Sequence, residues 1–181
     1  MKGIVFTEFL DMVEKEFGYE TVDHIIENSE LSSNGIYTAV GTYHHSEIIA
    51  LLGNLAATTK KDPSDLLKAF GRYIFETFLS QYPQFFEHHD HPFSFLESID
   101  DHIHVEVKKL YPDAILPKFQ TETTAEGKLV MIYSSERKMA PFALGLIEKS
   151  MSHYGHNPQI DMTHLEGDGS VVRFTIALDE S

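Results

Sequence analysis

Two histidines beside an apolar stripe are the first residues in this sequence that could bind a metal. Between Phe93 and Tyr111, apolar side chains recur at steps of three and four residues, which predicts one helix with a buried face. His102 and His104 flank that stripe, and side chains two residues apart on a helix point in very different directions. A neutral imidazole is a common metal ligand, but such a histidine is often only a hydrogen-bonded boundary residue. The spacing alone does not choose between His102 and His104.

A second candidate group is formed by Tyr133, Ser135 and Arg137, which alternate along a stretch expected to be extended. Their side chains would share one face of a strand and offer two hydroxyl groups and one guanidinium group. This set suits a ligand with two carboxylates, because arginine binds a carboxylate in a bidentate manner and hydroxyls donate to the remaining lone pairs. Three polar residues on the solvent-facing side of a strand would show the same spacing.

The run from His88 to His91 contains three histidines and Asp90. Such a run could chelate a divalent metal, which would make the chain a metal enzyme, but a solvated loop has the same composition. No general-base or nucleophile constellation accompanies the run, so the chain is expected not to be an enzyme. The remaining paired histidines are expected on the surface: His44, His45, His153 and His156.

Composition excludes several classes of protein. The formal net charge of −14 disfavours nucleic-acid binding, because phosphate contacts need clustered Lys and Arg. The absence of cysteine excludes disulfides, thiolate-bound zinc, iron–sulfur clusters and cysteine nucleophiles. No apolar run is long enough to span a membrane and no signal-peptide pattern is present, so a cytoplasmic protein is expected. The 181 residues fit one domain or two small lobes, and 13 phenylalanines suit a large planar cofactor or an ordinary aromatic core.

The first two thirds of the chain are expected to be mainly helical. Asp62 and Pro63 are typical of a helix start, and Gly18 stands where a helix would end. Residues 29–41 lack periodicity and are expected to form a loop. Helices are predicted at residues 2–17, 21–28 and 46–58, from Pro63 onward, in a short segment from Pro83, and at 93–111 and 141–153.

After Tyr111 and Pro112 the pattern changes to extended segments. Hairpin connections are predicted at residues 125–127 and 166–169, where glycine occurs. Helix-rich stretches followed by an antiparallel meander indicate the α+β class. Strands are predicted at residues 115–122, 128–134, 159–165 and 170–178.

The combination of these motifs resembles one known family. Tyr133-x-Ser135-x-Arg137 matches the Tyr-x-Ser-x-Arg signature of the H-NOX (haem nitric oxide/oxygen binding) domains, which include the haem domain of soluble guanylate cyclase. Asp101-x-x-His104, placed seven residues before Tyr111, resembles the proximal-histidine helix of these domains. The resemblance covers essentially the whole chain and extends to three further places: Pro117, Met1-Lys2-Gly3 and Phe70-Gly71-Arg72.

The resemblance implies a haem cofactor, namely haem b (protoporphyrin IX iron), ferrous for sensing. His104 would be the axial ligand of the haem iron, and Pro117 would distort the porphyrin. The two propionates would be held by Tyr133, Ser135 and Arg137.

The fold implied by the resemblance has a helical N-terminal lobe and a C-terminal lobe with a four-stranded antiparallel sheet plus helices, with the haem between them. Residues 1–181 would form a single H-NOX domain. Within it, residues 1–62 are expected to be a helical N-terminal subdomain and residues 63–181 a haem-holding α/β subdomain.

The expected gas selectivity depends on the distal side of the haem. Oxygen-binding relatives carry a distal tyrosine in the helix after the signature, where this chain has Phe142, and a slip by one residue would give Ala143. Neither side chain has a donor, and dioxygen gains more from a donor than nitric oxide does. Selectivity for nitric oxide is therefore expected, with CO also bound and O2 weak or absent. The predicted distal pocket consists of Ile4, Val5, Ile74, Phe78, Phe142 and Leu146.

The resemblance also implies how a signal would leave the domain. Nitric oxide would weaken the bond to His104 and release its helix, so that the two lobes rotate against each other. The chain ends at Ser181, soon after the last predicted strand, so the output is expected to lie in a separate protein. For a bacterial stand-alone member, that partner would be a sensor histidine kinase or a cyclic-di-GMP synthase or phosphodiesterase. The acidic surface suits a monomer.

Overall fold

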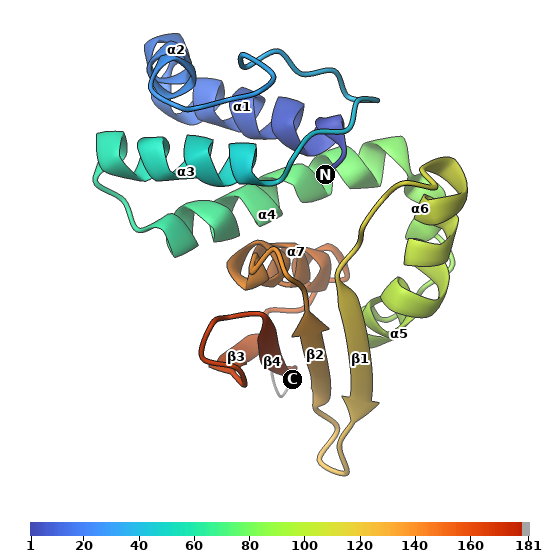
Figure 1. The fold of residues 1–181 in the computed structure, drawn as a ribbon. Helices are drawn as coiled ribbons and strands as arrows, with labels where there is room; N and C mark the ends of the chain where they lie inside the picture. Colours follow the sequence, from blue (N-terminus) through green and yellow to red (C-terminus); the bar gives the residue numbers. More distant parts are fainter. Residues whose placement is uncertain (179–181) are drawn as a thin grey trace.

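The computed structural model describes residues 1–178, in which helices α1 to α3 lie on one side of a long helix, α4, and the sheet lies on the other (Figure 1). α1 (Gly3–Phe17) ends at Gly18, whose φ of +87° suits glycine, and α2 (Tyr19–Glu27) follows at once. α3 is Ser46–Thr59. α4 (Pro63–Gln81) begins as predicted, since the Asp62 carboxylate accepts a hydrogen bond from the Ser64 backbone N–H at 2.8 Å.

The predicted helix over residues 93–111 is not continuous. After a short 3-10 helix at Pro83–Phe85, the chain forms α5 (Pro92–Ser98), a π-helical segment (Ile99–Ile103) and α6 (His104–Leu110). The prediction of one uninterrupted α-helix was therefore wrong. A π-helical turn contains one more residue than an α-helical turn, but the apolar residues in the sequence remain three and four positions apart. The sequence pattern is therefore the same for a continuous α-helix and for a helix with a π-helical turn.

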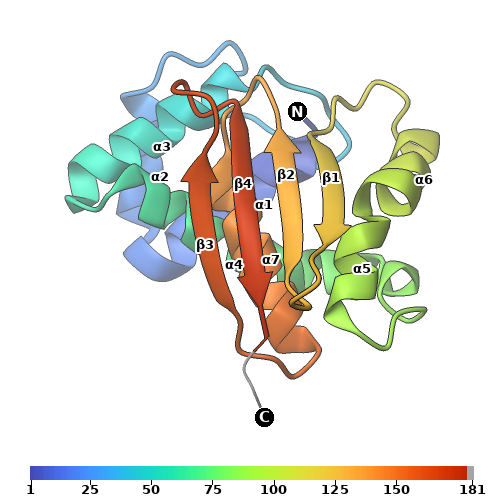
Figure 2. The same ribbon diagram turned by 90° about the horizontal axis from the view of Figure 1, so that it is seen from below.

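The C-terminal part is an antiparallel sheet of β1 (Lys118–Thr123), β2 (Leu129–Ser134), β3 (Gln159–His164) and β4 (Val171–Ala177), with α7 (Ala140–His153) between β2 and β3. The strand order is β1-β2-β4-β3, so the predicted meander is wrong. Helix α7 carries the chain past β2, and β3 consequently becomes an edge strand. One face of the sheet packs on α7, whereas Figure 2 shows the opposite face toward the viewer, with α7, α4 and α1 behind the strands and α5 and α6 beside β1.

Two groups of buried side chains make up the core. One joins α1, α2, α3 and the first part of α4, and the other joins the sheet, α5 and α7. α4 belongs to both, because Phe70 and Ile74 pack in the first group and Phe75 packs in the second. The observed α+β architecture, with a helical lobe and a lobe containing the four-stranded antiparallel sheet, confirms the predicted fold class.

α4 and α7 cross with their backbones in contact, which requires glycine on both helices. A Cβ atom added at Gly71 would lie 2.1 Å from the Phe142 carbonyl oxygen, and one added at Gly145 would lie 2.0 Å from the Lys68 carbonyl oxygen. Either substitution would therefore push the two helices apart.

Candidate functional site

A cavity of about 310 Å³ lies where the start of α1, the end of α4, the segment from α5 to residue 117, the end of β2 and α7 meet. This volume is within the range of about 300–1,000 Å³ that is usual for small-molecule and cofactor sites. Its wall is mainly aromatic and aliphatic. The apolar stripe of α5 to α6 faces this cavity, through Leu96, Ile99, Ile103, Val107 and Leu110.

His104, the first residue of α6, is the histidine that lines the cavity, whereas His102 is exposed. Burial lowers the pKa of His104, against the opposing effect of its hydrogen bond with Asp100, so the imidazole is neutral near pH 7. Its Nδ1 lies 3.3 Å from Asp100 Oδ1. A carboxylate only accepts hydrogen bonds, so Nδ1 carries the hydrogen and Nε2 keeps a free lone pair.

Tyr133, Ser135 and Arg137 all line the cavity, but not by strand alternation. β2 ends at Ser134, and Glu136 and Arg137 form a turn, so the expected common strand face applies to Tyr133 alone. The Tyr133 hydroxyl accepts a hydrogen bond from the backbone N–H of Met139 at 3.0 Å, and the Ser135 hydroxyl accepts one from the N–H of Arg137 at 3.2 Å. Each hydroxyl can still donate its own hydrogen.

The Arg137 guanidinium group is half-buried, and burial lowers its pKa from the ordinary value. No carboxylate within residues 1–178 forms an ion pair with it. A partly buried cation without a counterion is unfavourable, because desolvation is not offset by attraction. The cavity thus offers a charge and two hydroxyl donors to a ligand that carries carboxylates.

The residues predicted for the distal pocket separate into two groups. Ile74 is fully buried in the helical core and is not among the lining residues. The rotation along α4 turns Phe75 and Phe78 toward the cavity, which leaves Ile74 on the side that packs against α1 and α3. The other predicted residues line the cavity: Ile4, Val5, Phe78, Phe142 and Leu146, together with Pro117.

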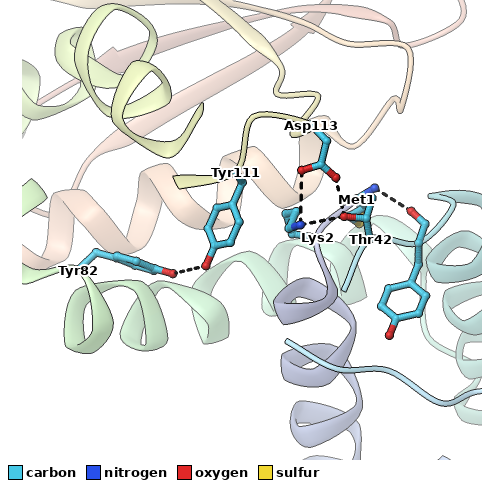
Figure 3. Close-up of polar contacts among 7 residues, drawn as sticks. Met1, Lys2, Thr42, Tyr82, Tyr111 and Asp113 are labelled. Atoms are coloured by element: carbon cyan, nitrogen blue, oxygen red, sulfur yellow. Dashed lines mark hydrogen bonds and ion pairs between the residues drawn. The ribbon is translucent and has the colours of Figure 1, made fainter. Parts of the chain in front are cut away.

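A polar cluster at the cavity edge was not predicted from the sequence (Figure 3). Lys2 Nζ donates a hydrogen bond to Thr42 Oγ1 at 2.8 Å and lies 3.6 Å from Asp113 Oδ1, and Thr42 Oγ1 donates to Asp113 Oδ2 at 2.7 Å. Lys2 Nζ also lies 4.9 Å from the Tyr111 ring centroid, and the Tyr111 and Tyr82 hydroxyls are 3.3 Å apart. The cluster connects the start of α1 to the segment that follows α6.

The histidines between residues 88 and 91 have separate partners. His89 Nδ1 lies 2.9 Å from Ser94 Oγ, and His91 Nδ1 accepts from the Phe93 backbone N–H at 3.2 Å, which caps α5. In residues 1–178, no group of three or more His, Cys, Asp or Glu side chains is placed to hold a metal ion. Over the same residues, no helix has both the length and the apolar character needed to cross a membrane.

Fold and cavity together define a cofactor-binding domain. The cavity has apolar walls, a neutral imidazole with a free lone pair and an arginine that finds no counterion in the described part of the chain, residues 1–178. These features fit a flat apolar molecule with carboxylates and a metal that accepts nitrogen. Haem has all of these features, since it joins an apolar macrocycle to two propionates and an iron with axial positions.

The comparisons with known proteins agree with this class. A family model described as haem-NO-binding matches residues 2–163. The Fe(II) unliganded H-NOX protein from K. algicida is 45% identical, with a TM-score of 0.96, covering 100% of this chain and 98% of its own. The IWP-051-bound H-NOX from Shewanella woodyi in the Fe(II)CO state is 36% identical, covering 98% and 94%, with a TM-score of 0.82. The H-NOX protein from S. oneidensis in the Fe(II)NO state is 26% identical, covering 99% and 100%, with a TM-score of 0.91.

No protein with a curated description matches the chain. The family match spans most of the sequence, and the chain belongs to the haem-NO-binding (H-NOX) family. The predicted resemblance is therefore confirmed. H-NOX domains bind haem and are sensors of gases such as NO, CO and O2 that act with signalling partners.

Proposed function

We propose that this chain binds haem b, ferrous during sensing, and reports nitric oxide to a separate signalling protein. The observation that supports this most strongly is the presence in one apolar cavity of the neutral His104 and of Arg137, which has no ion-pair partner among residues 1–178. When bound, haem supplies an iron that can take up a diatomic gas. His104 Nε2 would hold the iron, and Pro117, which also lines the cavity, would pack against the porphyrin and favour its distortion.

The propionates are the proposed partners of the polar residues at the end of β2. Arg137 provides a charge-assisted, bidentate contact, and the free hydroxyl hydrogens of Tyr133 and Ser135 donate to the remaining carboxylate oxygens. These contacts would supply the counterion that Arg137 does not find within residues 1–178.

The proposed selectivity for nitric oxide rests on the chemistry of the cavity wall. Ile4, Val5, Phe78, Phe142 and Leu146 exclude water and offer no hydrogen-bond donor. A donor is worth more to bound dioxygen than to nitric oxide or CO. We therefore propose binding of nitric oxide and CO, with O2 weak or absent.

In the proposed switch, residues 1–62 and residues 63–181 move relative to each other. Residues 179–181 lie outside the described part of the chain. Asp113 follows α6 and is bonded to Lys2 and Thr42 of the other part, so a displacement of α6 would be transmitted through this contact (Figure 3). Helix α4, which packs in both core groups, would have to accommodate the movement. The proposed receiver is a sensor histidine kinase or a cyclic-di-GMP synthase or phosphodiesterase in trans, and we propose no enzymatic activity for the chain itself.

Absorbance spectroscopy of the purified protein tests this function. We expect a Soret band that chelators do not remove, a shift on addition of nitric oxide and of CO, and no stable oxygen complex of the reduced protein in air. His104→Ala should retain haem only when imidazole is supplied, whereas His102→Ala, at an exposed position, should behave as the wild type. Absence of haem, or a normal spectrum in His104→Ala without imidazole, would refute the proposal.

A further inference from the structure

We propose that Asp100 is a positioning residue for His104. Its carboxylate orients the imidazole ring, increases the electron density on Nε2 and thereby determines how readily the axial bond of His104 is broken. This inference rests on the proposed function, since it assumes that His104 holds a haem iron. Three observations carry it: a local change of helix geometry, a shared carboxylate oxygen and a connection to the sheet.

The change of helix geometry occurs directly before His104. The backbone N–H of His104 donates to the Ile99 carbonyl oxygen, five residues back, which closes the π-helical turn of residues 99–103. Short π-helical turns are uncommon and occur frequently at functional sites. Here the turn changes the angular spacing just where Asp100 and His104 meet, so the spacing of the two side chains is not that of a regular α-helix.

A single carboxylate oxygen receives two donors. Asp100 Oδ1 lies 3.3 Å from His104 Nδ1 and accepts a hydrogen bond from the backbone N–H of Phe119 at 3.2 Å. Phe119 belongs to β1, and its ring centroid lies 6.0 Å from that of His104. The carboxylate is therefore held by the sheet as well as by its own helix, and the sheet indirectly orients the imidazole.

The chemical consequence follows from the contact on Nδ1. A carboxylate that accepts the Nδ1 hydrogen fixes the tautomer and makes the other ring nitrogen a stronger donor to a metal. At 3.3 Å the contact is longer than a typical N–H···O hydrogen bond, so it favours one orientation of the imidazole ring without fixing that orientation rigidly. Removing the carboxylate should weaken the axial bond, and nitric oxide should release His104 more completely.

The neighbouring Asp101 provides a matched control. It lies in the same π-helical turn and is exposed, and no residue within 1–178 forms a hydrogen bond with its side chain. Asp100→Asn and Asp101→Asn change the net charge equally. Asp100→Asn also keeps an oxygen that can accept from the Phe119 N–H, whereas Asp100→Ala removes both contacts.

The experiment compares the haem-loaded wild type with these three variants. The iron–histidine stretching band of the ferrous protein is measured by resonance Raman spectroscopy, and haem loss is measured by transfer to apomyoglobin. We expect the band to move to lower frequency in Asp100→Asn and further in Asp100→Ala, with haem loss from Asp100→Ala faster by roughly tenfold. Asp101→Asn should match the wild type in both measurements.

Two kinds of result would overturn the proposal. An unchanged band and unchanged haem loss in both Asp100 variants would show that the carboxylate does not act on His104, while haem binding by His104 would stand. An equal shift in Asp101→Asn would assign the effect to net charge alone. If the wild type bound no haem, the proposed function and this inference would fail together. Asp100→Asn, which preserves side-chain size, decides the question if Asp100→Ala does not fold.

Discussion

Replacing Arg137 with glutamine should weaken haem binding without destabilising the haem-free protein. In the haem-bound protein, the change removes the proposed charge-assisted contact to a propionate. Hydrogen bonds to charged groups contribute about 1.5–3 kcal/mol, which corresponds to roughly 10–150-fold in affinity. Arg137 is only half-buried, so solvent screening places the expected effect near the lower limit, about tenfold faster haem loss.

In the haem-free protein the same substitution should not destabilise the fold. Burial lowers the pKa of Arg137, which means that the folded state disfavours the charged form. Glutamine carries no charge, and the backbone N–H at this position still donates to Ser135 Oγ. We therefore expect an equal or higher midpoint of thermal unfolding, measured by circular dichroism.

Haem transfer to apomyoglobin and thermal unfolding together decide this prediction. Arg137→Lys keeps the charge but loses the bidentate geometry, so its rate of haem loss should lie between those of the wild type and Arg137→Gln. His102→Ala serves as the control at an exposed position. Haem loss from Arg137→Gln equal to that from His102→Ala, combined with a lower unfolding midpoint, would show that Arg137 holds the fold and not the cofactor.

Three further predictions follow from other contacts. Phe142→Tyr places a hydroxyl on the cavity wall and should raise the affinity for oxygen about 2–12-fold, for a hydrogen bond of about 0.5–1.5 kcal/mol. Absorbance titration of the reduced wild type and variant over a range of oxygen pressures measures this change, and an unchanged titration would place the gas elsewhere. Tyr37→Phe removes a 2.8 Å hydrogen bond to the buried carboxylate of Glu47. The free energy of unfolding should fall by about 1–3 kcal/mol and the unfolding midpoint by several degrees. Tyr19→Phe, at an exposed position, should have no effect. Burial lowers the pKa of His89, so its contribution to stability is complete above the ordinary value of about 6.5 and is lost as the pH falls below it. His89→Gln should therefore flatten the loss of stability on acidification below that pH, and an identical slope would contradict the assignment.

Local signals in the sequence predicted most helices, because helix ends depend on nearby residues. Asp62 and Pro63 start α4 through a cap that involves only the next few residues. The order of the strands was not predictable in the same way, since alternation within a strand does not name its neighbours. The π-helical turn before His104 was missed because it changes the hydrogen bonding and not the spacing of apolar residues.

The residues of the candidate site were likewise predictable only in part. His104 and Arg137 were selected by motif resemblance, and the cavity brings them together although they come from different elements. Ile74 was misplaced because α4 is apolar on more than one side, so periodicity cannot tell which core each residue joins. The cluster of Lys2, Thr42 and Asp113 joins residues that are far apart in the chain, and such a contact leaves no local signal.

The contact between α4 and α7 has a consequence for how such a sensor can change during evolution. Gly71 and Gly145 allow the close approach of these helices and are not among the lining residues, whereas the side chains of Phe142 and Leu146 line the cavity. Substitutions at the lining positions can therefore alter the chemistry of the cavity wall while both glycines are kept. Substitutions at Gly71 or Gly145 would increase the distance between α4 and α7 while the lining side chains are kept. The chemistry of the cavity wall and the approach of the two helices thus depend on different residues of one helix pair.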